Sequence, residues 1–227
     1  MGILYWIIFL GIALVSWIVS FSLKRKFERY SQEPLGMTGA QVAEKMLHDH
    51  GIYDVQITCI PGQLTDHYNP TNQTVNLSEE VYNGANVASA AVAAHECGHA
   101  VQHAEEYGPL RVRSALVPVV SFSSNWVTWI ILAGMLLLGT NAGPILMLIG
   151  IALYAMITLF SFITLPVEVN ASQRAVNWLR EAGITDNETT QMASDALHSA
   201  AYTYVVAALS ALATLIYYIL IFLGRRR

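Results

Sequence analysis

The run His95-Glu96-Cys97-Gly98-His99 has the residue types and the spacing of a metal-dependent hydrolase. Residues four apart on a helix share one face, so His95 and His99 can present both imidazoles to one metal ion. Glu96 can then reach a water at that metal without itself being a ligand. Zinc lowers the pKa of such a water to about 7, and a glutamate so placed serves as general base. The run predicts zinc-dependent hydrolysis; the alternative is the polar face of an ordinary helix.

Catalytic zinc usually has three protein ligands and one open position, so a third ligand must come from another part of the chain. His103 continues the four-residue spacing but lies one turn farther along a straight helix, which makes it a weak candidate. The metzincin pattern fails, because its glycine and histidine positions hold Gln102 and Glu105. Cys97 lies about 200° around the helix from His95, so we expect it to be a packing residue.

Glu168 is the strongest candidate for the third ligand. It is the acidic residue that follows the apolar stretch ending at Leu165-Pro166. A carboxylate at the edge of a bilayer is costly, and it therefore indicates a functional site; the alternative is a solvated interfacial residue. Zinc is accordingly the predicted cofactor, with His95, His99 and Glu168 as its candidate ligands.

The composition is that of a membrane protein. Apolar residues make up 54% of the 227 residues and charged residues only 12%, about half the fraction of a soluble domain. The net charge of −4 leaves no basic excess to meet phosphates, which argues against a nucleic-acid partner. Two cysteines cannot build a disulfide-rich scaffold, and we expect both thiols to be unpaired.

Four stretches are long and apolar enough to cross a bilayer, which takes about 20 residues. They are Ile3–Ser22, Leu116–Leu138, Ile145–Leu165 and Thr203–Leu223, with a turn at residues 139–144 between the second and the third. The first could be a signal peptide, but its positive charges follow the apolar run instead of preceding it. The positive-inside rule then places residues 24–115 and 166–202 on the cytoplasmic side, although the three terminal arginines count against this orientation. Because two of the predicted spans lie between the histidine pair and Glu168, all three residues are expected on the same side of the membrane.

The first polar segment has the pattern of a small α+β unit. A capped helix is expected from Thr38 to Gly51, strands at 55–60 and 74–77 with a turn-rich stretch between them, and an alanine-rich helix from Asn86 to about Glu106. The second polar segment, 166–202, is expected to form two helices. Gly183 ends the first, and a capping box at 185–188 starts the second, which runs into the last span.

The sequence resembles the YugP-type neutral zinc metallopeptidases of bacterial membranes over nearly its whole length. The blocks that carry the resemblance are Leu64-Thr-Asp-His-Tyr-Asn-Pro70, Leu77-Ser78-Glu79, Ala93-Ala-His-Glu-Cys-Gly-His-Ala-Val-Gln102, Leu165-Pro-Val-Glu-Val-Asn-Ala-Ser172 and Thr203-Tyr204-Val205. More distantly it is similar to the membrane gluzincins. The resemblance implies His95, His99 and Glu168 as ligands and Glu96 as base. The gluzincins carry an aspartate four residues after the third ligand, where this chain has Ser172, so any carboxylate support of a ligand must come from elsewhere.

Three further residues are weaker candidates. Tyr204 could stabilise a developing oxyanion, although tyrosine at that position is also typical of an aromatic belt at the membrane surface. His67 could form part of a substrate wall, but a turn held by the Asp66 and Asn69 side chains explains it equally well. His198 has the pattern of a solvated helix face.

We therefore expect a mainly α-helical integral membrane protein with four transmembrane helices and a small α+β, gluzincin-like zinc-protease unit at the membrane surface. The segments are 1–23 (anchor), 24–115 (HExxH unit), 116–165 (two spans), 166–202 (third ligand) and 203–227 (last span and tail). The expected function is hydrolysis of peptide bonds in peptides or membrane proteins near the lipid, with substrates pairing to strand Thr74–Leu77 as an edge.

Two other functions compete with this reading. A membrane scaffold or chaperone with a structural zinc would have no use for Glu96 as a base. A transporter would need ionisable residues deep in the spans, and the predicted spans carry none. The sequence carries no signal for an oligomeric state.

Overall fold

The computed structural model describes the backbone of residues 2–224, and their side chains except at positions 2–5 and 8. The chain is mainly helical with one small mixed sheet. It divides into two compact units. We call residues 1–17, 112–165 and 203–227 the helical unit, and residues 18–111 and 166–202 the α+β unit. Each is described by itself below.

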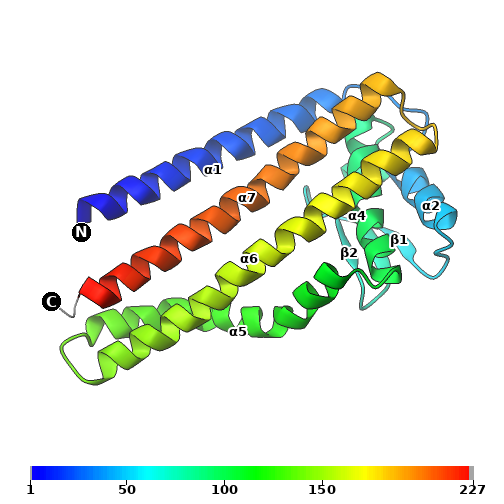
Figure 1. The fold of residues 1–227 in the computed structure, drawn as a ribbon. Coiled ribbons are helices and arrows are strands. Elements are labelled where there is room, and N and C mark those ends of the chain that lie inside the picture. Colours follow the sequence, from blue (N-terminus) through cyan, green and yellow to red (C-terminus); the bar gives the residue numbers. More distant parts are fainter. Residues whose placement is uncertain (1, 225–227) are drawn as a thin grey trace. The chain divides into compact units, whose positions relative to one another are not determined.

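The helical unit is built from parts of four helices (Figure 1): α1 (Gly2–Tyr30), α5 (Gly108–Leu136), α6 (Ala142–Glu181) and α7 (Asn187–Gly224). Among the described residues, α5, α6 and α7 are long and apolar enough to cross a membrane. The predicted span at 3–22 lies on α1, and several of its side chains fall outside the described residues, so a fourth span stays a prediction.

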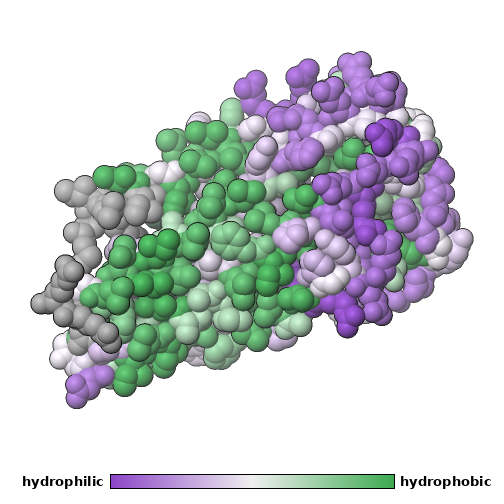
Figure 2. Space-filling view, viewed as in Figure 1, coloured by the Kyte–Doolittle hydropathy of each residue, from purple (hydrophilic) through white to green (hydrophobic). Residues whose placement is uncertain are grey.

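Close packing of α5 against α6 forms the core of the helical unit. Val127 and Ile131 on α5 and Met147 on α6 are buried there. Glycines permit this contact, because a Cβ at Gly134 would lie 2.9 Å from the Met147 backbone nitrogen. Figure 2 shows hydrophobic residues over the outer surface of these helices, as expected for helices that face lipid.

The sheet of the α+β unit has three strands in the order β1-β3-β2: β1 (Gln56–Ile60), β3 (Thr74–Ser78) and β2 (His67–Asn69). β1 runs parallel to β3, and β2 runs antiparallel to it. The prediction that strand 74–77 is an edge is therefore wrong, because the stretch predicted to be turn-rich contains β2, which pairs with the remaining side of β3. Asn76 helps to join the strands: its side chain accepts a hydrogen bond from Thr58 and donates to the His67 carbonyl.

Helices α2 (Gly39–Asp49), α3 (Glu79–Asn83) and α4 (Val87–Ala104) form the core with this sheet. The predicted cap of α2 is confirmed, since Thr38 and Gln41 form a reciprocal capping box. Asn86 caps α4 by accepting a hydrogen bond from the Ser89 backbone N–H. Alanines on α4 let α2 approach closely, and this produces a dense apolar core around Met46 and Leu47.

Two predictions about the second polar segment need correction. Residues 166–181 are not a separate helix: α6 runs through Pro166, because a proline removes one backbone N–H donor without ending a helix supported by packing. The cap of α7 is Asp186, not Thr185. Asp186 Oδ1 accepts from the Thr189 N–H at 2.8 Å, whereas the buried Thr185 hydroxyl bonds Thr190 instead. Gly183 does follow the end of α6, with a φ of +67° that favours glycine.

A polar cluster joins α1 to α7 inside the α+β unit. Asp195 on α7 accepts from Lys26 Nζ and from the Tyr30 hydroxyl, both at 2.7 Å. Lys26 also donates to Ser199 at 2.8 Å. These bonds hold the basic end of α1 against a helix more than 160 residues away in the sequence.

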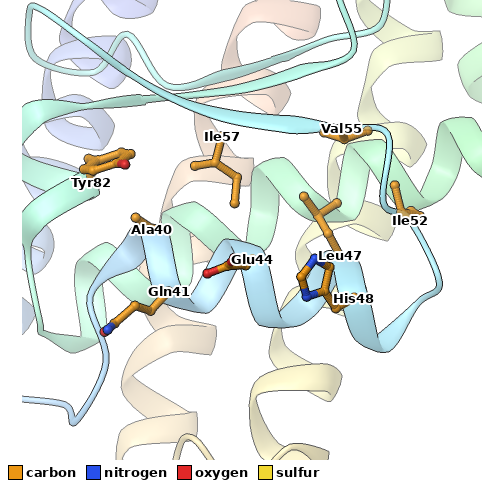
Figure 3. A pocket seen from close by; sticks show the side chains of 9 residues that line it. All are labelled: Ala40, Gln41, Glu44, Leu47, His48, Ile52, Val55, Ile57 and Tyr82. Atoms are coloured by element: carbon orange, nitrogen blue, oxygen red, sulfur yellow. The ribbon is translucent and has the colours of Figure 1, made fainter.

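A groove lies between α2 and β1 (Figure 3). Leu47, Ile52 and Ile57 form its apolar floor, while Glu44 and His48 stand at its rim. β1 and β2 are the two edges of the sheet, so this groove lies at the opposite edge from β2.

Candidate metal centre

Helix α4 carries His95, Glu96 and His99 in a largely buried position. Gly98 lies between these residues, and it faces α6 so closely that a Cβ there would lie 2.7 Å from the Ala171 carbonyl oxygen. The absence of a side chain at Gly98 thus sets the distance between α4 and α6. Glu168 lies one turn before Ala171 on α6, and the close approach brings it to the histidine pair.

The structure brings one ligand atom each from His95, His99 and Glu168 within 4.8 Å of one another. Glu168 Oε2 lies 3.4 Å from His95 Nε2 and 3.5 Å from His99 Nε2. In a tetrahedral zinc site with bonds of about 2.0–2.1 Å, ligand atoms are separated by roughly 3.3–3.5 Å. The donor set and its spacing therefore fit a zinc ion.

The second nitrogen of each imidazole contacts a neutral oxygen-bearing side chain. His99 Nδ1 lies 3.0 Å from Gln102 Oε1, and His95 Nδ1 lies 3.1 Å from Ser172 Oγ. Such partners fix the ring orientation of metal-binding histidines. Ser172 thus contacts a candidate ligand from the position where the gluzincins carry an aspartate, but with a hydroxyl in place of a carboxylate.

Glu96 is 8% exposed, and strand β2 holds its carboxylate in place. Its Oε2 accepts a hydrogen bond from the Tyr68 backbone N–H at 3.0 Å. The Tyr68 hydroxyl lies 3.0 Å from His103 Nδ1, so β2 is attached to α4 at two points. Burial, and to a lesser degree the charge of Asp54, raises the pKa of the Tyr68 phenol, which keeps this hydroxyl protonated.

Nearby carboxylates influence His99 in the absence of metal. Burial lowers its pKa, but the hydrogen bond to Glu168 and the charges of Glu96 and Glu168 outweigh burial, so the pKa of His99 lies above its ordinary value. The cluster thus attracts positive charge, and binding of a metal ion competes with protonation of His99.

The structure places the other predicted residues as follows. His67 is exposed on β2, and its Nδ1 donates to the Thr65 carbonyl at 2.7 Å. Asp66 and Asn69 do accept backbone hydrogen bonds, from Ser78 and Thr71. Tyr204 lies on α7 in the helical unit, and His198 is exposed on α7. Functional roles for His67 and Tyr204 stay predictions.

The two cysteines are free, as predicted. Cys97 is fully buried, and its thiol donates to the Ala43 carbonyl at 3.6 Å, which agrees with a packing role. His103 contacts Tyr68 and lies outside the cluster of candidate ligands.

Sequence reasoning missed three contributors to the site: the Tyr68 backbone amide, Gln102 and the contact of Gly98 with α6. Gln102 was considered only as a position that breaks the metzincin pattern. A sequence signal for it existed, because it lies three residues after His99 and so on the same side of the helix. The sequence contains no signal for the Tyr68 amide, because any residue other than proline supplies a backbone N–H.

Fold and site together define a protein with membrane-length helices and a His-His-Glu cluster of the kind that holds zinc. The chain belongs to the family described as "Putative neutral zinc metallopeptidase", which it matches over residues 5–223. It is 43% identical over 223 residues to the "Putative membrane protease YugP" of Bacillus subtilis (strain 168), covering 96% of this chain and 97% of that protein. No solved structure matches the chain.

Proposed function

We propose that the protein is a zinc-dependent endopeptidase of the membrane. The observation that carries this proposal is the cluster of His95, His99 and Glu168 with the carboxylate of Glu96 on the same helix as the histidines. Among the described residues this cluster supplies three ligands, which is the number that leaves a fourth zinc position open for chemistry. The name of the Bacillus relative, a membrane protease, agrees with it.

In this proposal His95, His99 and Glu168 hold the zinc ion, which would supply the Lewis acidity that activates a water and polarises a peptide carbonyl. Glu96 takes one proton from the water as the water oxygen attacks the carbonyl carbon of the peptide. It then delivers that proton to the departing amine nitrogen as the C–N bond breaks. Because the Tyr68 N–H holds Oε2, the other carboxylate oxygen of Glu96 is the one that exchanges the proton.

Substrates pair with β2, in place of the central strand first expected. The Tyr68 N–H points to Glu96 and therefore away from β3, so the outer edge of β2 lies beside the base. An extended peptide on this edge would place its backbone next to Glu96. His67 is an exposed substrate contact beside it, and Tyr204 is a candidate oxyanion donor.

The membrane arrangement is part of the proposal. Four crossings, at the segments 1–23, 116–165 and 203–227, put segments 24–115 and 166–202 on the cytoplasmic side. The three helices of membrane length support it, as do nine of the twelve Lys and Arg residues, which lie in the two cytoplasmic segments. Cys59 is exposed in the α+β unit. A membrane-impermeant maleimide should therefore label Cys59 in lysed cells but not in intact ones, and labelling of intact cells would reverse the orientation.

The substitution Glu96→Gln tests the catalytic role. We expect the purified full-length protein in lipid nanodiscs to cleave fluorescein-labelled denatured casein in a zinc-dependent manner. Glu96→Gln should slow this about 100- to 10,000-fold while one zinc per chain remains bound. Glu106→Gln, a change of an exposed acid just after α4, is the matched control and should behave as wild type. Equal cleavage by wild type and Glu96→Gln would refute Glu96 as the general base, whereas zinc binding with no cleavage at all would favour a scaffold with a structural zinc.

A further inference from the structure

A chain of hydrogen bonds runs from the protein surface to the buried candidate ligand His99. It begins at Glu105, which accepts from Arg174 Nη2 at 2.6 Å. Arg174 Nε donates to Asn170 Oδ1 at 2.8 Å, and Gln102 Nε2 donates to the same oxygen at 2.9 Å. The last step joins Gln102 Oε1 to His99 Nδ1 at 3.0 Å. Gln102 is fully buried, so this chain passes through the interior between α4 and α6.

Two groups fix the direction of the bonds in this chain: Arg174, which orients the Asn170 side chain, and the Val167 carbonyl, which together with Asn170 orients Gln102. A guanidinium has only donors, so the Asn170 atom that faces it must be the amide oxygen. That oxygen and the Val167 carbonyl are both acceptors, and both face one end of the Gln102 side chain, the carbonyl at 2.8 Å. This end of Gln102 must therefore be its NH₂ group. The other end, facing His99, is the amide oxygen, and His99 Nδ1 must then be the donor.

The arrangement has a chemical consequence for His99. A neutral imidazole that is protonated at Nδ1 carries its lone pair at Nε2. Nε2 is the atom that lies 3.5 Å from Glu168 Oε2, inside the cluster of candidate ligands. The hydrogen-bond chain thus selects the ring form that can bind a metal at that point.

We propose that Arg174, acting through Asn170 and Gln102, is a positioning residue that holds His99 in its zinc-binding tautomer. This inference rests on the metal site of the proposed function. His95 provides a contrast: its partner is the Ser172 hydroxyl, which can donate or accept and therefore selects no tautomer. The same Gln102 amide also binds the Val167 carbonyl, one residue before Glu168, so it fixes two candidate ligands together.

Zinc affinity, measured by competition with a chromophoric chelator, tests the proposal without any need for peptidase activity. Gln102→Leu should weaken zinc binding about 10- to 100-fold, the range for loss of an outer-shell partner. Arg174→Met should weaken it about 3- to 10-fold, although Arg174 touches none of the candidate ligands. Arg174→Lys keeps a donor-only group and should bind nearly as wild type. Arg180→Met, on the same helix, is the control.

Two further variants separate tautomer selection from simple bracing of the fold. Asn170→Asp offers only acceptors to Arg174 and Gln102, so zinc affinity should be retained, whereas Asn170→Ala should lower it. The double variant Gln102→Leu/Arg174→Met should lose no more affinity than Gln102→Leu alone, because both changes break one chain. In ¹⁵N-histidine spectra of the metal-free protein, recorded at a pH where His99 is neutral, the Nδ1–H tautomer of His99 should predominate in wild type and lose that predominance in Gln102→Leu.

The outcomes distinguish this inference from the proposed function. A wild-type protein that binds no zinc refutes the metal site itself. Zinc binding by wild type with equal affinity in Arg174→Met, or with losses that multiply in the double variant, overturns the role of Arg174 and leaves the metal site intact.

Discussion

Gly98 makes a demanding test of how the metal centre is built, because an added methyl group there meets backbone and not a flexible side chain. In Gly98→Ala the new Cβ would lie 2.7 Å from the Ala171 carbonyl oxygen and 3.2 Å from the Ala171 carbonyl carbon and Cα. Ordinary contacts begin near 3.4 Å, so α4 and α6 must separate by about 0.7 Å at this point. All of the displaced atoms belong to main chain, and side-chain rotation cannot relieve the clash.

The separation has two calculable effects. Overpacking of this kind costs about 1–3 kcal/mol, and the better helix propensity of alanine returns about 1 kcal/mol, so the free energy of unfolding should fall by about 0–2 kcal/mol. Zinc sites tolerate changes of only about 0.2 Å in ligand distance. A shift of Glu168 away from His95 and His99 several times larger should lower zinc affinity about 10- to 100-fold. The metal should therefore be affected more strongly than the fold.

The assay compares zinc affinity, by chelator competition, with stability in urea for the metal-free protein. Gly108→Ala is the matched control, because a Cβ at Gly108 has nothing within 4 Å. We expect Gly108→Ala to leave both quantities unchanged. If Gly98→Ala bound zinc as wild type does, the close approach of the two helices would not be what sets the site, and the reasoning would fail.

The remaining predictions concern single contacts. Ser172→Ala should lower zinc affinity about 10-fold by removing the partner of His95, as chelator competition can measure, and unchanged affinity would show that the hydroxyl is dispensable. Cys59 should react with a maleimide in the native protein while Cys97 reacts only after denaturation, and mass spectrometry should find one label and then two. Asp195→Ala should lower the free energy of unfolding by about 1–2 kcal/mol, because two donors on α1 lose their acceptor; a smaller change in urea unfolding would mean that solvent replaces these bonds.

The spacing of the histidines and the position of Glu168 were open to prediction because each follows a simple physical rule. Four-residue spacing on a helix places His95 and His99 on one face whatever surrounds the helix. Glu168 could be predicted as a candidate ligand because a carboxylate at the end of an apolar stretch, near the edge of a bilayer, is energetically costly and so indicates a functional site. The helix caps were partly predictable: Thr38 behaves as its pattern indicates, but at α7 two neighbouring residues could serve, and burial of Thr185 leaves Asp186 as the cap.

Other features depend on partners far away in the sequence. β2 is only three residues long and contains none of the alternation that marks a strand, so its pairing with β3 decides its structure. Pro166 is a typical helix breaker, yet α6 continues through it. The orientation of the Gln102 amide depends on Val167 and Asn170, which lie more than 60 residues away. No local pattern contains that information.

If substrates pair with β2 as proposed, the shortness of this strand has a consequence for the selection of cleavage sites. Alternate residues of a strand face the same edge, so of the three residues of β2 only Tyr68 faces outward, and its N–H already donates to Glu96. An incoming chain is left with one main-chain hydrogen bond, to the Tyr68 carbonyl, worth about 0.5–1.5 kcal/mol. Binding this weak would discriminate poorly between substrate sequences. In the proposed peptidase, such binding would favour substrate segments that are already extended over segments with a particular sequence, so damaged or unassembled chains would be better substrates than folded ones.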